Sequence, residues 1–398
     1  MLKPSMAARV PFLDLKAQYA SIRDEILEAV HQVLDSAHFV GGEWVERFED
    51  EFARYVGARY AVATGNGTDA LQLVLRAWGI GPGDEIIVPA NSFFATAEAV
   101  SNVGATPVFA DVGPLTYHLD TVSVESCITS RTRAIIPVHL YGRAMDMREI
   151  ASLAEAHGLA ILEDACQAHG TRYRGVHVGG SGQPACFSFY PGKNLGAYGD
   201  GGAITCNDAH LAESLRILRD HGSPAKYQHV AVGTNSRLDS VQAAVLSVKL
   251  RYLEDWNRAR AQHAAAYIRA FAKLPAMEEP VLPPITLPAQ EHNYHLFVVR
   301  APKRDAMRAF LSERGIETGI HYPTPLHLTA AYQALGYSGP GSFSVAEGLA
   351  GEILSLPIYP ELASEQIGRV MAAVEEFTVQ QPVRRVAFAS AHSQAALA

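Results

Sequence analysis

The feature that most constrains the fold is an alternation of short apolar runs with stretches long enough to form helices. Seven of these runs read as strands and lie at residues 60–63, 85–88, 107–110, 134–138, 160–162, 185–189 and 203–206. Such an alternation predicts a mostly parallel sheet that helices cover on both faces. We therefore expect an α/β fold with a mostly parallel seven-stranded sheet, whose ligand lies at the carboxyl ends of the strands.

Helical patterns flank this alternating region. Residues 16–35 and 45–55 carry apolar side chains at helical spacing, which predicts two amphipathic helices. Beyond residue 250 we expect a long exposed helix at 251–271, a proline-rich link at 274–290, strands at 295–299 and 317–321, and helices at 305–314 and 361–377. This organisation predicts a large domain over residues 1–250, a small C-terminal α/β domain over 251–380 and a loosely ordered tail over 381–398.

The composition is that of a chain that buries a core and binds small molecules. Of the 398 residues, 48% are hydrophobic and 19% charged, which excludes global disorder. The net charge of −8, without a Lys/Arg cluster, argues against nucleic acid or an anionic membrane as the main partner.

Cysteine usage and the lack of long apolar runs indicate a cytoplasmic protein. The four cysteines form no CxxC pair and have no histidine at metal-ligand spacing, so we expect reduced thiols and no metal site. No apolar signal-peptide core and no run of 18 apolar residues occur, so neither a signal peptide nor a membrane span is predicted.

One lysine has an unusual setting. Residues 187–205 read FSFYPGKNLGAYGDGGAIT, which places Lys193 on a turn between a short strand and a glycine-rich loop. A lysine that forms a Schiff base needs rigid surroundings and a partly dry pocket, because desolvation lowers its pKa. The same pattern also fits a glycine-rich hairpin with a solvated lysine, and the motif alone does not decide between them.

Polar or aromatic residues follow most of the predicted strands. GNGTDAL at residues 65–71 opens a helix, so its N–H groups can hold a phosphate, although a plain strand-helix turn has the same pattern. Asp164 ends a strand, with Gln167 close behind, and an acid there can pair with a pyridinium nitrogen. Phe93 fits an aromatic side chain that stacks on a flat cofactor ring, and it also fits a core residue. His139 fits a general base, a stacking partner or a hydrogen-bonded core histidine.

Successive strand ends thus carry a turn that can hold a phosphate, an acid that can pair with a ring nitrogen, an aromatic side chain and a lysine between a short strand and a glycine-rich loop. Together these features describe a site for pyridoxal 5′-phosphate (PLP). From PFLDL near the start to the helix ending near Phe377, the chain also resembles the DegT/DnrJ/StrS family of sugar aminotransferases. The motifs that carry the resemblance are FEDEFARYVGARYAVATGNGTDAL, GPGDEIIVPANSFFATAEAV, EDACQAHG, SFYPGKNLGAYGDGGAI and NSRLDSVQAAVL. The resemblance implies the fold-type I architecture of PLP-dependent transferases.

The resemblance also implies a role for each matching residue. Lys193 corresponds to the lysine that forms the internal aldimine and moves the proton, and Asp164 to the partner of the pyridine nitrogen. The remaining cofactor contacts that it implies are Gln167 on the phenolic oxygen, Phe93 on the ring, Gly67, Thr68 and Ser188 on the phosphate, and Asn235, donated across a dimer interface to the neighbouring subunit's phosphate. A homodimer with shared active sites follows. Cys166 departs from the pattern, which has a small residue such as alanine there.

The substrate is implied by the same resemblance. VHLYGRAMDM, which contains His139, resembles members that aminate C3 of a nucleotide-linked 3-keto-deoxyhexose. Tyr190 and the His321-Tyr322 pair also resemble that subgroup and are expected near the sugar, while Lys226 fits either a pyrophosphate contact or a solvated lysine. The implied reaction transfers an amino group from L-glutamate to a dTDP-linked 3-keto-6-deoxyhexose in a ping-pong cycle.

Other functions remain open. The acceptor can instead be a cyclitol ketone without a nucleotide, or a 4-keto nucleotide sugar. A dehydratase on this scaffold would carry a histidine in place of Lys193, and a non-catalytic regulator would be expected to lose Lys193 or Asp164. Both residues are present in this chain.

Overall fold

The computed structural model describes residues 9–275, 279–288, 290–336 and 341–380. At its centre lie two four-stranded sheets. The first has the order β3 (Thr106–Ala110), β2 (Glu85–Pro89), β4 (Thr132–Ile135), β5 (Ala160–Ile161), and the second the order β6 (Glu163–Asp164), β9 (Ala185–Ser188), β10 (Gly202–Cys206), β1 (Tyr60–Thr64).

The two sheets are continuous. Only Leu162 separates β5 from β6, and its N–H donates to the carbonyl of Ile135 at 3.1 Å. Because β5 and β6 therefore form one strand, the combined sheet has the seven strands that the sequence predicts. Neighbouring strands pair in parallel except at β10, which runs antiparallel to both β9 and β1.

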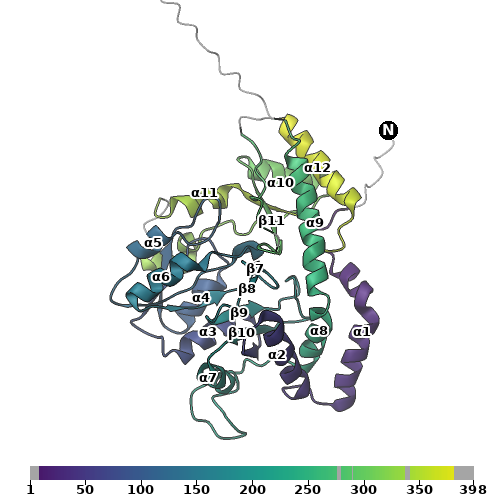
Figure 1. Ribbon diagram of the computed structural model, residues 1–398. Helices are drawn as coiled ribbons and strands as arrows, with labels where there is room; N and C mark the ends of the chain where they lie inside the picture. Colours follow the sequence, from purple (N-terminus) through teal and green to yellow (C-terminus); the bar gives the residue numbers. More distant parts are fainter. Residues whose placement is uncertain (1–8, 276–278, 289, 337–340, 381–398) are drawn as a thin grey trace, which may run out of the picture.

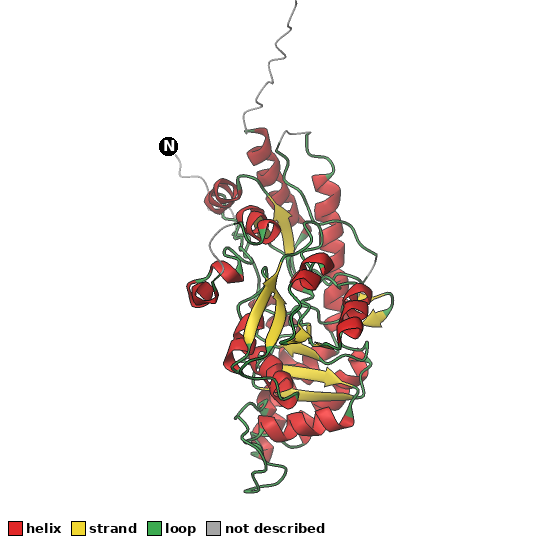
Figure 2. Cartoon of the chain, turned by 90° about the vertical axis from the view of Figure 1, so that its left-hand side faces the viewer, coloured by secondary structure: helices red, strands yellow, loops and turns green. Residues whose placement is uncertain are grey.

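Helices cover both faces of this sheet (Figure 2). Alternate side chains of a strand point to opposite faces, and in β1 Val62 packs with one set of helices while Ala61 and Ala63 pack with another. The Val62 side holds α3 (Gly67–Ala77), α4 (Ala95–Asn102) and α7 (Ala209–Arg219), and the opposite side holds α2 (Glu43–Val56), α5 (Thr121–Ser126), α6 (Met147–His157) and α8 (Ser240–Leu250). The predicted two-sided covering is confirmed.

A second core lies in the C-terminal part of the chain. It contains α9 (Leu253–Phe271), β11 (Phe297–Arg300), α10 (Arg304–Glu313), β12 (Ile353–Leu356) and α12 (Ser364–Val379), with β11 and β12 antiparallel. Figure 1 shows α9, α10 and α12 in the upper part of the molecule, near β11. Phe297 and Val299 face this core, whereas Val298 between them faces the core of the large sheet. The C-terminal unit is thereby packed directly against the sheet domain.

The remaining elements connect the two cores. The helix α1 (Leu15–Ser36) packs on α8, and Val10 ahead of it is buried in the C-terminal core. The shorter elements are β7 (Arg172–Tyr173), β8 (Val176–His177), α11 (Ser344–Glu352) and the 3₁₀ turns η1 (Leu140–Gly142), η2 (Leu326–Leu328) and η3 (Ala330–Leu335). The domain boundaries remain a prediction, and Val10 shows that the first residues described pack with the smaller unit.

Three expectations for the C-terminal half need correction. Residues 317–321 form no strand, because Ile316 pairs with Val10 and Gly319 with Ser355 through single bridges to different partners. The helix expected from residue 361 begins at Ser364. The helix α9 is not fully exposed, since a stripe that includes Trp256, Arg260 and Ala264 is buried. The predicted tail lies outside the described residues.

Within the described ranges, no helix combines the length and apolarity needed to cross a bilayer. The same residues contain no group of three or more His, Cys, Asp or Glu side chains that could hold a metal ion. All four cysteines are free thiols.

Candidate active site

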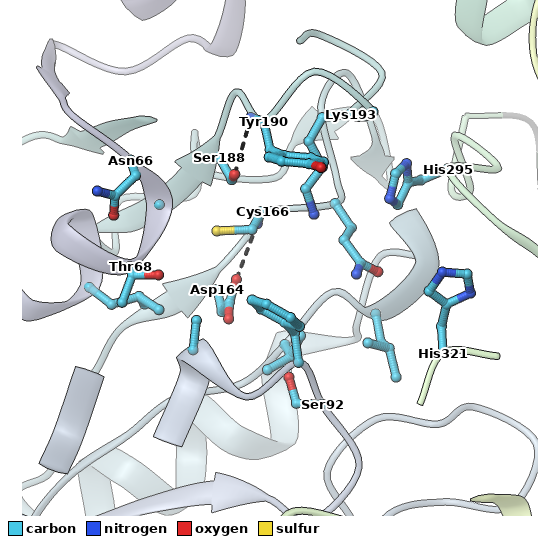
Figure 3. A pocket seen from close by; sticks show the side chains of 18 of the residues that line it. Asn66, Thr68, Ser92, Asp164, Cys166, Ser188, Tyr190, Lys193, His295 and His321 are labelled. Carbon is cyan, nitrogen blue, oxygen red and sulfur yellow. Dashed lines mark hydrogen bonds between the residues drawn. The ribbon is translucent and has the colours of Figure 1, made fainter. Parts of the chain in front are cut away.

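A cavity of about 950 Å³ lies at the carboxyl ends of the parallel strands, where the alternation of strands and helices predicts the ligand. Its volume is in the range of ligand pockets. Ten of the predicted site residues line it, namely Gly67, Thr68, Phe93, Asp164, Gln167, Ser188, Tyr190, Lys193, His321 and Tyr322. Figure 3 shows Asn66 and Thr68 toward one end, His295 and His321 at the other, and Lys193 between them.

The first turn of α3 lines one end of the cavity. Asn66 caps this helix, since its side chain accepts from the N–H of Asp69 at 2.8 Å. The N–H groups of Gly67 and Thr68 precede the first intrahelical hydrogen bonds, and such groups can bind an anion. A Cβ on Gly67 would lie 2.7 Å from Cβ of Ser188, so only glycine allows this close approach of helix and strand. The geometry fits a bound phosphate group.

Asp164 is a buried carboxylate that forms no ion pair with the described part of the chain. It is 5% exposed, and its Oδ2 accepts from Oγ1 of Thr96 at 2.8 Å. The N–H of Cys166 donates to its other oxygen at 3.2 Å. No cationic side chain in the described ranges forms an ion pair with it, and an unpaired buried charge is costly. A protonated pyridine nitrogen would supply the missing partner, so Asp164 fits the ring of PLP.

Thr96 and Ser92 orient this carboxylate, a role that the sequence assigned to neither residue. Because the single proton on Oγ1 of Thr96 goes to Asp164, Ser92 donates to Oγ1 of Thr96 at 2.8 Å. Both residues lie in ANSFFATAEAV, four positions apart at the start of α4. Hydroxyl residues at this spacing after a strand end are the signal that could have identified them.

Lys193 stands on a loop that is fixed from several sides. Its own N–H donates to the carbonyl of Tyr190 at 2.9 Å. The next residue, Asn194, donates to the side chain of Asn257 at 2.8 Å and to the carbonyl of Asn293 at 3.1 Å. The buried side chain of Lys249 donates to the carbonyl of Gly196. This loop therefore provides the rigid support that a Schiff-base lysine requires.

The amine of Lys193 enters the cavity and makes no hydrogen bond or ion pair with the described residues (Figure 3). Burial lowers its pKa, an effect that the nearby Cys166 and Asp164 partly oppose. A lower pKa leaves a larger fraction of the amine neutral, and the neutral amine is the nucleophile. This is the setting that the sequence analysis expects for a Schiff-base lysine.

The walls for a flat ring come from Phe93, Gln167 and Tyr322. Phe93 is 54% exposed, with its ring tilted toward Tyr322 at a centroid distance of 5.5 Å. Gln167 donates from Nε2 to the hydroxyl of Tyr322 at 3.1 Å. An exposed aromatic face and an amide on the cavity wall fit the predicted stacking contact and the predicted contact to the phenolic oxygen.

Tyr141 is a positioning residue that the motif HLYG contains but the sequence reasoning did not single out. Its N–H donates to Oε1 of Gln167 at 2.6 Å, and its hydroxyl donates to the carbonyl of His321 at 2.5 Å. Its φ of 63° lies in the left-handed region, where a bulky side chain is unusual. The buried Tyr141 thus connects the part of the cavity wall at Gln167 with the part at His321.

His139 is the hydrogen-bonded core histidine that the sequence left open, and its alternative assignment as a substrate contact was wrong. The side chain is 1% exposed and does not line the cavity. Its Nδ1 accepts from the N–H of Met145 at 3.0 Å, which leaves Nε2 to donate to Glu163 at 3.0 Å. Both ring nitrogens are therefore used within the core.

Asn235 and Lys226 do not line the cavity of their own chain. Both are exposed residues of the segment between α7 and α8, which extends from the body of the molecule below α7 (Figure 1). Asn235 pairs through its backbone with Asp220 at the base of this segment. The contacts expected for these two residues are therefore not made within their own chain in this structure.

The seven-stranded sheet with one antiparallel strand, together with the lysine and the buried carboxylate at its edge, defines a PLP-dependent transferase of fold-type I. Residues 20–375 match the model of the DegT/DnrJ/EryC1/StrS aminotransferase family. The chain belongs to this family and is a PLP-dependent aminotransferase.

Individual relatives match along nearly the whole chain. A dTDP-3-amino-3,4,6-trideoxy-α-D-glucose transaminase of Streptomyces venezuelae is 51% identical over 372 residues, which cover 93% of this chain and 96% of that protein. A pleiotropic regulatory protein of Geobacillus stearothermophilus is 47% identical over 368 residues, with coverage of 92% and 98%. The crystal structure of S. venezuelae DesV with a ketimine intermediate aligns with a TM-score of 0.91 at 49% identity, covering 94% of this chain and all of that one.

Proposed function

We propose that the enzyme transfers an amino group from L-glutamate to C3 of a dTDP-linked 3-keto-6-deoxyhexose. The observation that carries this proposal is the convergence of Tyr190, His321 and Tyr322 on the cavity that also holds Lys193. Tyr190 is 60% exposed at the cavity wall, where a large acceptor can reach it. The S. venezuelae transaminase, whose name specifies a dTDP-linked 3-amino sugar, supports the same substrate class.

The residues of this chain divide the chemistry among them. When bound, PLP supplies an electron sink for the bond that the reacting carbon must break. With PLP bound, Lys193 would accept the proton from the donor's α-carbon and carry it to C4′ of the cofactor. Asp164 would keep the ring nitrogen protonated, and the first turn of α3 would hold the phosphate. Lys193 serves both halves of the ping-pong cycle, whereas Tyr190, His321 and the hydroxyl of Tyr322 contact the acceptor only in the sugar half.

The similarity to a regulatory protein favours a second candidate, a regulator that keeps the fold. Such a protein has no need for a desolvated amine beside an unpaired buried carboxylate. Both features cost folding free energy unless a ligand uses them. Lys193 and Asp164 therefore support the enzyme.

Variants of residues that are proposed to contact the sugar should slow the half-reaction with the keto sugar more than the half-reaction with glutamate. His321 stacks on Phe12 and its Nδ1 bonds to Oγ of Ser355 at 2.8 Å, while burial lowers its pKa to about 4, so the ring is neutral at pH 7. We expect His321→Gln and Tyr322→Phe to reduce kcat/KM for the keto sugar by about 10-fold to 100-fold, the loss of a buried hydrogen bond. The half-reaction with glutamate, followed by the absorbance of the cofactor, should change much less. Equal losses in both halves would refute the sugar assignment.

The shared homodimer remains part of the proposal, with Asn235 of one subunit reaching the phosphate bound by the other. The exposure of Asn235, outside its own cavity, supports it. Asn235→Ala should weaken cofactor binding by roughly 1.5–3 kcal/mol, the value of a hydrogen bond to a charged group.

Lys226 is proposed to contact the sugar diphosphate from the same segment. The four free thiols support a reducing, cytoplasmic location.

Mixed dimers give a sharper test of the shared sites. Lys193→Ala and Asn235→Ala subunits, each impaired alone, should regain activity when they assemble together. In the hybrid, one site combines an intact Lys193 with an intact Asn235 of the partner subunit. No gain of activity in hybrids verified by mass spectrometry would show that Asn235 acts within its own subunit or not at all.

A further inference from the structure

Arg260 is a buried cation on the wall of the active-site cavity. It lies on the inner face of α9, is 2% exposed and lines the cavity. Its Nη1 donates to the carbonyls of Ile358 at 2.8 Å and Tyr294 at 3.4 Å. These two neutral acceptors fix the guanidinium but leave its charge uncompensated.

The guanidinium has unused binding capacity. Its Nε is buried and has no hydrogen-bond partner, and none of the described carboxylates forms an ion pair with it. Glu361 raises its pKa through space, although burial has the larger effect and lowers the pKa to about 10. Arg260 is therefore still protonated at neutral pH. A buried, protonated arginine without a counter-ion is costly unless an anion completes the site.

Three observations indicate which anion fits. Arg260 donates to the carbonyl of Tyr294, and the next residue, His295, bonds to Asn194 beside Lys193, so the guanidinium lies on the lysine side of the cavity. The opposite end, at Asn66 and Thr68, holds the phosphate turn (Figure 3). Arg260 is also deep in the wall, in contrast to the exposed Tyr190, so a small anionic group suits it better than a nucleotide diphosphate.

Beside Arg260, His295 is oriented for a different contact. Both amide hydrogens of Asn194 are directed at Asn257 and Asn293, so its Oδ1 accepts from Nδ1 of His295 at 3.2 Å. Nε2 of His295 is then an acceptor and cannot donate to an anion. Among these neighbours, Arg260 is the group that can bind a carboxylate.

We propose that Arg260 binds a carboxylate of the amino donor and so provides a subsite that the sugar half-reaction does not use. This rests on the proposed function, in which an amino acid and a keto sugar react in turn at Lys193. The donor carries its α-carboxylate on the carbon that loses the proton, and the sugar ring has no equivalent charge. A fixed guanidinium at this position binds the donor and orients its α-carbon toward Lys193.

The test uses glutarate, a dicarboxylate without an amino group, with the full-length enzyme loaded with PLP. Isothermal titration calorimetry should show that glutarate binds, and stopped-flow absorbance should show that it competes with L-glutamate. In Arg260→Lys, both the glutarate Kd and the half-saturating glutamate concentration should rise at least tenfold. The reverse half-reaction with an amino sugar should stay within about twofold. Arg258→Lys is the matched control, because Arg258 is on the same helix but exposed and paired with Asp255.

Unchanged glutarate affinity in an Arg260→Lys variant with normal melting temperature would overturn the proposal. So would an equal loss in the amino-sugar half-reaction, which would indicate a diphosphate or structural role. If the variant folds poorly, a crystal structure of the unaltered enzyme with glutarate provides the test. The proposal requires a carboxylate of glutarate against Arg260. Glutarate with both carboxylates bound elsewhere would contradict the proposal. If glutarate binds at Arg260 but no nucleotide sugar reacts, the proposed function fails while this subsite stands.

Discussion

Replacing Lys193 with alanine should lower turnover by about 10⁴-fold or more, because the change removes the nucleophile and the proton carrier together. The unaltered enzyme should be yellow with PLP bound, and borohydride should bleach it by fixing the cofactor to the protein. Peptide mass spectrometry should place the label on Lys193. The variant should keep its melting temperature, since the amine makes no hydrogen bond or ion pair with the described residues.

Lys249 provides the internal control for this experiment. Its pKa is also lowered by burial, to about 8, yet its amine bonds to the carbonyl of Gly196 and does not line the cavity. If a low pKa were sufficient for reaction with PLP, borohydride would fix the cofactor to both lysines. If access to the cavity is also required, only Lys193 is labelled. A colourless protein after incubation with PLP, or full turnover in Lys193→Ala, would contradict the assignment.

Asp164→Asn should reduce turnover by about 10³-fold at unchanged melting temperature. Removing one partner of a buried ion pair costs about 3–5 kcal/mol, and each 1.36 kcal/mol is a factor of ten in rate. The amide keeps the size of the side chain and can still accept from Thr96, so the change tests the charge. Turnover should be measured with saturating cofactor, which separates weak binding from slow chemistry.

Thr96→Val is the matched control for Asp164→Asn. It retains the shape of the threonine and the charge of Asp164, but removes the hydrogen bond that orients the carboxylate. A loss of about tenfold is expected, the value of one hydrogen bond to a charged group. If the two variants lose activity equally, orientation of the carboxylate, and not its charge, would be what the reaction requires.

Strand positions and strand-end chemistry could be predicted from the sequence because both are local. The β-branched runs predicted all seven strands, and parallel pairing then placed Gly67, Asp164 and Ser188 at one edge. Lys193 was recognisable because glycines and a short strand frame it within a few residues. These features depend on neighbours in the chain, which the sequence displays directly.

Features that depend on distant segments could not be predicted. Whether His139 faces the cavity or the core is decided by Glu163 on the adjacent strand, 24 residues later. Residues 317–321 have the composition of a strand, but Val10 and Ser355 each pair with only one residue of that region. Arg260 reads as part of an exposed helix, and only carbonyls 34 and 98 residues further on reveal that it is buried.

The most direct measurement runs the sugar half-reaction backwards. The PLP-loaded enzyme is mixed with nucleotide-linked 3-amino sugars, nucleotide-linked 4-amino sugars and free aminocyclitols, and the visible absorbance of the cofactor is followed. We expect a dTDP-linked 3-amino-6-deoxyhexose to remove this absorbance with simple saturation, and the other two classes to leave it unchanged. Conversion by a 4-amino nucleotide sugar or an aminocyclitol, with no response to any 3-amino nucleotide sugar, would contradict the proposed function.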